Sequence, residues 1–148
     1  DAIQNKWNDT EQAIKSRDMI ANFIDEACSN YPVDKNKVTL LGFSQGTILS
    51  YAVALTYPKK VKNIIALSGY ISEDMLPENM NPNQFSHLNF YCSHGSLDQV
   101  IPVEWARKSP KFLKDLGIKH NYSEFHVGHG VSPQNFYELR SWLELLLK

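Results

Sequence analysis

The sequence predicts a three-layer αβα fold with a mostly parallel sheet. Segments with strand character alternate with segments of helical apolar spacing along the 148 residues, and this alternation is typical of α/β proteins. The strand that precedes Ser44 shows no alternation of polar and apolar residues, which indicates burial on both faces, as in a parallel sheet covered by helices. We find neither an internal repeat nor a linker, so we predict a single domain over residues 1–148.

The first third of the chain predicts a helix, a strand and a second helix. Asn8 resembles the N-cap of the first helix, with Glu11 three residues further on, and Tyr31-Pro32 ends this helix. A strand is predicted over 38–43 and a helix over 45–57. The first helix has one apolar stripe, made of Ala13, Ile14, Ile20, Ala21, Ile24, Ala27 and Cys28.

The rest of the chain continues the alternation. Gly117 is placed as the C-cap of one helix, and Ser132 can cap the last helix with Pro133 at its first position. The last helix presents an apolar face formed by Phe136, Leu139, Trp142, Leu143 and Leu146. The predicted elements are a strand over 61–70, an irregular segment over 71–87, a strand over 90–93, a helix over 102–116, a strand over 122–127 and the terminal helix.

Composition excludes several classes of protein. The net charge is −1 and the basic residues are scattered, so we expect no nucleic-acid partner. No run approaches the roughly 18 apolar residues that cross a bilayer, so we expect no stable membrane insertion. Cys28 and Cys92 give neither a disulfide framework nor a metal-ligand spacing, and they favour a reducing, cytoplasmic compartment. The sequence begins at Asp1 without an initiator Met. This start is compatible with an N-terminal targeting segment.

The segment Gly42–Gly46 (GFSQG) lies between the strand over 38–43 and the following helix, which is the context of a nucleophile elbow. Such a turn holds Ser44 in a strained conformation, and we expect a side chain at position 42 or 46 to collide with the neighbouring backbone. The helix would direct the N–H of Gln45 toward a developing oxyanion. The alternative is an ordinary strand-to-helix turn in which Ser44 is only an N-cap.

A serine hydroxyl needs an imidazole as base and a carboxylate to orient that imidazole. Asp98 follows the third predicted strand and His129 follows the fourth, so both lie at the same sheet edge as Ser44. The order Ser, Asp, His is the one expected for this architecture. Asp98 can also be read as a plain turn residue.

Other residues compete less well for these two roles. Asp115 falls within a predicted helix, and Asp74 falls in the irregular segment. The remaining histidines are His87 and His120, which we expect to be solvated, and His94 and His126, which we expect to satisfy local backbone groups. His129 lies between Gly128 and Gly130 in a post-strand loop and is therefore the histidine that is free to reach Ser44.

Together these segments resemble the phospholipase/carboxylesterase family of α/β-hydrolases, which includes the acyl-protein thioesterases. The resemblance rests on Gly42–Gly46, on the HGSLD segment 94–98 with Ile101-Pro102, and on Gly128-His129-Gly130 before a terminal amphipathic helix. It implies Ser44 as nucleophile, Asp98 as acid, His129 as base and the Gln45 N–H as half of the oxyanion hole. It also implies that no cofactor or metal is needed, and homodimers occur in the family.

The sequence departs from the family pattern in two places. Thr47 stands where a second glycine is usual, and we expect it to crowd the first helical turn slightly without removing a catalytic atom. Members also begin with further strands and a His-Gly-rich loop that supplies the other oxyanion N–H, so we expect these residues to form the C-terminal two-thirds of a larger hydrolase. The strand over 38–43 would then have an unpaired apolar edge.

These observations predict a serine hydrolase that cleaves carboxylic esters or thioesters of small to medium acyl groups. Ile71, Met75 and Leu76 are the residues that we expect to line the acyl pocket; the alternative is that 71–87 is a surface loop with a few buried anchors. The rival interpretation is a non-catalytic binding protein, or an inactive fragment, on the same fold.

Overall fold

The computed structural model describes the backbone of residues 2–148 and the side chains of residues 9–148. Its centre is a four-stranded parallel sheet with the strand order β1-β2-β3-β4. The helices are α1 (Ala2–Asn30), α2 (Gln45–Thr56), α3 (Val103–Ala106), α4 (Ser109–Asp115) and α5 (Pro133–Leu147). The strands are β1 (Thr39–Phe43), β2 (Asn63–Leu67), β3 (Asn89–Gly95) and β4 (Lys119–Phe125). None of the described helices is long and apolar enough to cross a membrane.

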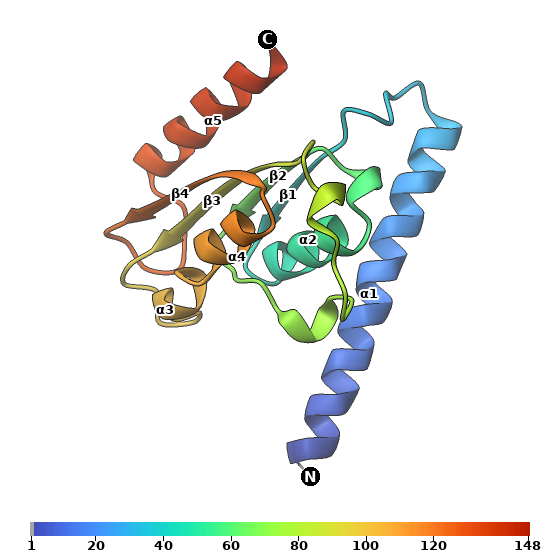
Figure 1. The fold of residues 1–148 in the computed structure, drawn as a ribbon. Helices are drawn as coiled ribbons and strands as arrows, with labels where there is room; N and C mark the ends of the chain where they lie inside the picture. Colours follow the sequence, from blue (N-terminus) through green and yellow to red (C-terminus); the bar gives the residue numbers. More distant parts are fainter. Residues whose placement is uncertain (1) are drawn as a thin grey trace.

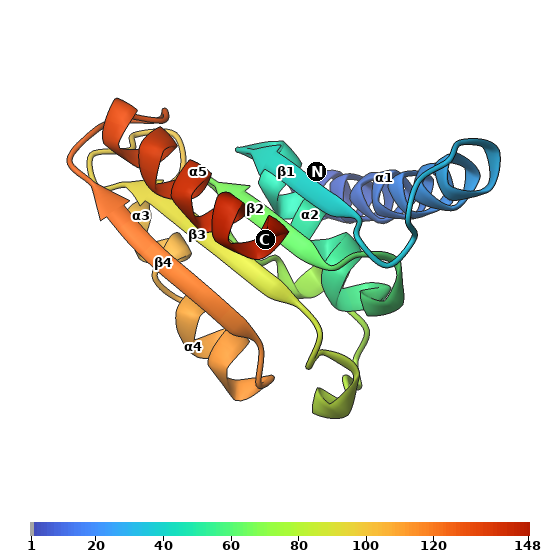
Figure 2. The same ribbon diagram turned by 90° about the horizontal axis from the view of Figure 1, so that it is seen from above.

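The helices form two layers, one on each face of the sheet (Figures 1 and 2). α5 covers one face, where Leu139 packs on Ile65, Leu67 and Tyr91. α1, α2 and α4 lie on the other face, over the larger core that includes Ile64 and other fully buried side chains. The predicted three-layer αβα arrangement with a parallel sheet is therefore confirmed.

The first helix begins earlier than the sequence indicated. α1 starts at Ala2, so Asn8 lies within the helix and is not its N-cap. Its predicted end is confirmed, because the helix ends at Asn30, directly before Tyr31-Pro32. Ala21 and Ile24 are buried against the core, as the apolar stripe predicted.

β1 is an edge strand, and the prediction that both of its faces are buried is wrong. It pairs with β2 on one side and with no other described strand. Leu41 is 61% exposed and Phe43 is 41% exposed, because α5 lies over β2 and β3 and leaves this face of β1 uncovered (Figure 2). The unpaired apolar edge that the sequence predicted for this strand is present.

The predicted helix over 102–116 is two short helices. Pro110 lies in the first turn of α4, and in a continuous helix its ring would clash with the carbonyl group of Ala106, four residues earlier. The chain therefore ends α3 at Ala106 and restarts at Ser109. Gly117 then ends α4 with a φ of +70°, as its predicted capping role requires.

The start of α5 is tied to the middle of the sheet. The Ser132 side chain accepts a hydrogen bond from the Asn135 backbone N–H, which confirms the predicted cap. The Asn135 side chain, which is buried, accepts a hydrogen bond from Ser93 Oγ and donates one to Tyr91 OH, both on β3. Because the loop between β4 and α5 carries His129, this network fixes one end of that loop.

Candidate active site at the carboxyl edge of the sheet

Ser44 occupies the sharp turn between β1 and α2. Its backbone has φ 57° and ψ −117°, a sparsely populated conformation for a residue with a side chain. A Cβ on Gly42 would lie 2.5 Å from the carbonyl oxygen of Gly46, so glycine is required at position 42. A Cβ on Gly46 would meet nothing within 4 Å, so the expected collision at position 46 is wrong: Gly46 brings its backbone close to Gly42, and its own side-chain direction is open.

The two glycines make a matched pair for measuring stability. We expect Gly42→Ala to lower the free energy of unfolding by about 3 kcal/mol, because backbone atoms cannot yield to the added methyl group. We expect Gly46→Ala to change it by less, or to raise it by up to about 1 kcal/mol, because alanine favours the helix. Denaturant unfolding of both variants measures the difference. Equal destabilisation of the two variants would contradict the close approach at Gly42.

Thr47 reinforces the elbow. Its side chain is fully buried, and its Oγ1 donates a hydrogen bond of 2.6 Å to the Leu67 carbonyl oxygen at the end of β2. The Ser44 N–H donates to the same oxygen at 2.9 Å. The threonine at this position therefore joins the first turn of α2 to the neighbouring strand.

The three residues predicted to act together are in hydrogen-bond contact. His129 Nδ1 lies 2.7 Å from Asp98 Oδ2, and His129 Nε2 lies 3.0 Å from Ser44 Oγ. An ionised carboxylate can only accept hydrogen bonds, so Nδ1 carries the proton and donates it to Asp98. Nε2 is then left to accept a hydrogen bond from the Ser44 hydroxyl, which is the arrangement that a general base requires.

Asp98 is held as a carboxylate. Its side chain is fully buried, which opposes ionisation, but hydrogen bonds from His129 and from the backbone N–H groups of Ile101 and Val100 outweigh burial. The pKa of Asp98 therefore lies below its usual value. Both N–H groups donate to Oδ1 at 2.8 Å, so Oδ2 is the oxygen that faces His129.

This lowered pKa predicts a pH-dependent contribution to stability. In the unfolded chain Asp98 has a pKa of about 3.9, and in the folded protein its pKa is lower. The ionised carboxylate therefore stabilises the fold above about pH 4. This stabilisation disappears as the pH falls through the folded-state pKa. We expect the difference in free energy of unfolding between the wild type and Asp98→Asn to shrink as the pH falls from 6 toward 3. Urea unfolding at several pH values measures it; a constant difference would contradict the assignment.

His129 is held between the elbow and the loop after β3. Its ring centroid lies 4.9 Å from that of Phe43, the residue before Ser44. Its side chain is 20% exposed, so a substrate could reach it. A Cβ on Gly95 would collide with the carbonyl oxygens of Val127 and Gly128, so glycine at the end of β3 lets the loop that carries His129 approach.

The backbone N–H of Gln45 has no intrahelical acceptor, because Gln45 is the first residue of α2. The positive end of the α2 dipole lies at the same place. This N–H is therefore available to a negatively charged oxygen next to Ser44.

Two clefts share Tyr70 as a lining residue, and the larger of the two lies beside the elbow. The one next to Gln45 has a volume of about 870 Å³ and is lined in part by Met75, Ile48 and Leu49. The other has a volume of about 620 Å³ and lies between the segment after β2 and the helices α3 and α4, where Ile71 is part of the wall. Leu76 is partly buried against the core and is not among the residues that line either cleft.

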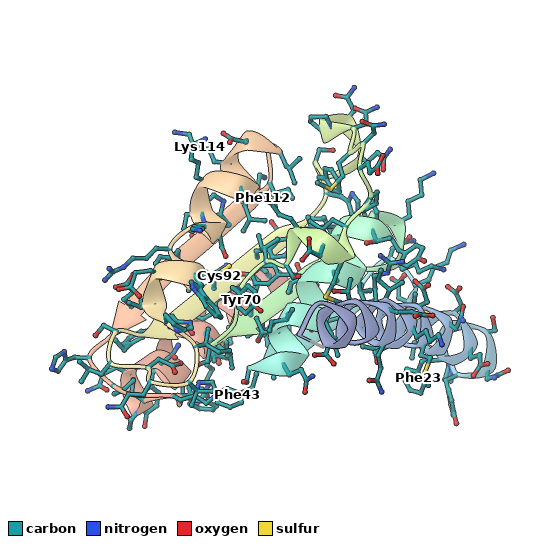
Figure 3. The ribbon with its side chains drawn as sticks, turned by 90° about the horizontal axis from the view of Figure 1, so that it is seen from below. Phe23, Phe43, Tyr70, Cys92, Phe112 and Lys114 are labelled. Carbon is teal, nitrogen blue, oxygen red and sulfur yellow. The ribbon has the colours of Figure 1, made fainter. Side chains whose placement is uncertain are left out.

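The sequence did not single out two large side chains of these clefts. Tyr70 lines both, and Trp105 lines the smaller one with its ring 5.1 Å from the Tyr70 ring. Figure 3 labels Tyr70 with Phe112, a third aromatic residue of the smaller cleft. Tyr70 could have been noticed because it follows the strand next to the elbow, where parallel strands place ligand-binding residues.

The other histidines lie outside the contact chain from Ser44 to Asp98, with one exception. His87 and His120 bond to the carbonyl oxygens of Pro58 and Ile118, respectively. His94 bonds to the Ile101 carbonyl oxygen, as predicted, but its Nε2 also lies 3.3 Å from Asp98 Oδ2. Among the residues whose side chains are described, no three His, Cys, Asp or Glu side chains are grouped as metal ligands would be.

A parallel sheet with helices on both faces, with Ser44 after β1, Asp98 after β3 and His129 after β4, defines the α/β-hydrolase fold. The solved structures agree on the fold: the Bacillus cereus carboxylesterase superposes with a TM-score of 0.79 at 16% identity, covering 90% of this chain and 61% of its own. Arabidopsis thaliana SOBER1 superposes with a TM-score of 0.74 at 23% identity, covering 92% of this chain and 65% of its own.

The chain belongs to the phospholipase/carboxylesterase family, whose model matches residues 1–147. Among its relatives, acyl-protein thioesterase 1 of Saccharomyces cerevisiae is 29% identical over 97% of this chain and 60% of its own length. Acyl-protein thioesterase 1 of Emericella nidulans is 26% identical over 99% and 62%. The chain therefore spans about three-fifths of the length of these relatives.

Proposed function

We propose that this protein is a serine hydrolase that cleaves carboxylic esters or thioesters of small to medium acyl groups through an acyl-enzyme. The observation that carries the proposal is the unbroken contact chain from Ser44 Oγ through His129 to the buried Asp98 carboxylate. The relatives named above as carboxylesterases and thioesterases support the same class of reaction.

In the first half-reaction Ser44 Oγ bonds to the acyl carbon while its proton passes to His129 Nε2. The carbonyl electron pair moves to the oxygen, which the Gln45 N–H stabilises. When this oxygen reforms its double bond, the bond to the leaving alcohol or thiol breaks, and His129 returns the proton to the leaving group. Water then attacks the acyl carbon, again with His129 as base, and releases the acid and free Ser44.

The buried Asp98 carboxylate holds the His129 ring in the required tautomer and stabilises the imidazolium that forms. We assign the acyl-binding role to these two clefts, the larger of which is lined by Gln45 and Met75 and the smaller by Ile71. Leu76 packs against the core. Tyr70 connects the two clefts and becomes part of this assignment.

The free thiols of Cys28 and Cys92 suit a reducing compartment, so we propose that the protein acts in the cytoplasm.

The experiment that tests the proposal is the intact mass of the protein before and after treatment with a fluorophosphonate, followed by digestion to locate the adduct. We expect one adduct per chain, on Ser44, together with turnover in a panel of ester and thioester substrates of different acyl length. No adduct, or an adduct on a different residue, would reject the serine-hydrolase mechanism and favour the binding-protein alternative.

A further inference from the structure

His94 is a buried histidine in contact with the carboxylate that orients His129. It lies near the end of β3, and its side chain is fully buried. Its Nε2 is 2.9 Å from the Ile101 carbonyl oxygen and 3.3 Å from Asp98 Oδ2. Oδ2 is also the oxygen that accepts the hydrogen bond from His129 Nδ1.

The surroundings of the ring determine which nitrogen carries the proton. Both neighbours of Nε2, a carbonyl oxygen and a carboxylate oxygen, can only accept, so Nε2 must be the N–H. Nδ1 is buried and has no hydrogen-bond partner among the described side chains and backbone groups. A proton on Nδ1 would be an unsatisfied buried donor, which costs more than an unsatisfied lone pair on a neutral ring.

His94 also closes the loop that carries Asp98. Ile101 donates its N–H to Asp98 Oδ1, and its own carbonyl oxygen accepts from His94 Nε2. Two hydrogen bonds therefore connect β3, through His94 and Ile101, to the Asp98 carboxylate. It restrains rotation of the carboxylate about its Cβ–Cγ bond, and such rotation would move Oδ2 away from His129.

We propose that His94 is a positioning residue for the hydrolase reaction. Its Nε2–H donates a hydrogen bond to the Ile101 carbonyl oxygen and directs a positive dipole at Asp98 Oδ2. Asp98 Oδ2 thereby keeps its hydrogen bond with His129 Nδ1. The inference rests on the proposed function, because orientation of Asp98 matters only if His129 serves Ser44 as base. A purely structural His94 would fill space in the sheet and could be replaced by any side chain of similar volume.

The tautomer of His94 can be measured in the wild-type protein without substrate. Histidine-selective ¹⁵N labelling, with assignment by the His94→Gln variant, reports which ring nitrogen is protonated at neutral pH. We expect a neutral ring with the proton on Nε2. A proton on Nδ1 would overturn the proposal, because no N–H would then face Asp98, and this result does not depend on whether the protein hydrolyses esters.

Two variants separate positioning from packing. His94→Gln keeps an amide N–H near the place of Nε2, whereas His94→Leu fills the site without a donor. We expect the rate of fluorophosphonate labelling to fall by about 10-fold to 100-fold in His94→Leu, as for other misplaced catalytic groups, and to return to within about 3-fold of the wild type in His94→Gln. We also expect the downfield NMR resonance of the His129 Nδ1 proton to be lost or shifted upfield in His94→Leu and retained in His94→Gln.

Equal losses in the two variants, or unchanged labelling and an unchanged resonance in His94→Leu, would overturn the proposal. Circular dichroism and thermal unfolding check that both variants fold. If His94→Leu does not fold, the proposal is decided by the tautomer of His94 in the wild type and by the labelling rate and His129 resonance of His94→Gln. If the wild type itself is not labelled, the proposed function fails, while the tautomer and the His129 resonance still show whether His94 positions Asp98.

Discussion

Replacing Ser44 by alanine is expected to lower kcat/KM for an ester substrate by about five to six orders of magnitude, to the level left when a serine triad loses its nucleophile. The Oγ atom that accepts the acyl group is removed, while the elbow, the Gln45 N–H and the clefts remain. The measurement is turnover of a chromogenic ester, together with intact-mass labelling by a fluorophosphonate, which should disappear.

The matched control is Ser50→Ala. It is the same chemical change six residues along on α2, where Ser50 Oγ bonds only to the Gly46 carbonyl oxygen within the helix. We expect this variant to keep its labelling rate within about 3-fold of the wild type, since it loses one helix-internal hydrogen bond of modest net value. Residual ester hydrolysis in Ser44→Ala above about one-thousandth of the wild-type rate would show that a different group acts as nucleophile.

Asp98→Asn is expected to lower kcat/KM by about three to four orders of magnitude with little change in KM. The backbone N–H groups of Val100 and Ile101 both donate to the Oδ1 position, so the amide oxygen must take that place. The amide NH₂ group then faces His129 Nδ1, which has to accept instead of donate. His129 is forced into the tautomer that carries its proton on Nε2, and that nitrogen can no longer accept the proton of Ser44.

The control for this variant is Asp115→Asn on α4, which removes an exposed carboxylate paired with Lys111. We expect it to leave the rate unchanged and the stability nearly so, because exposed ion pairs contribute little. Steady-state kinetics with a chromogenic ester, with KM and kcat separated, is the measurement. A loss of less than about 10-fold in Asp98→Asn would mean that Asp98 does not control the tautomer of His129.

Local patterns in the sequence were sufficient for much of this structure. The alternation of strand and helix predicted the parallel αβα sheet. Ser132 marked the start of α5 through a hydrogen bond from Asn135, three residues away, and Gly117 marked the end of α4 through its own positive φ. Ser44, Asp98 and His129 could be found because parallel strands bring their carboxyl ends to one edge, so the residue that follows each strand is placed by the topology.

Other features depend on how helices and loops pack in three dimensions, which local sequence patterns do not encode. The exposure of Leu41 and Phe43 follows from where α5 lies on the sheet, which the composition of β1 does not encode. The contact of His94 with Asp98 requires the loop after β3 to fold back on its own strand. The sequence alone thus determined which elements form and which side chains reach the sheet edge, because these depend on short-range periodicity and strand order. Only the tertiary structure decided which faces stay open and which buried groups touch, because packing across the fold sets those distances.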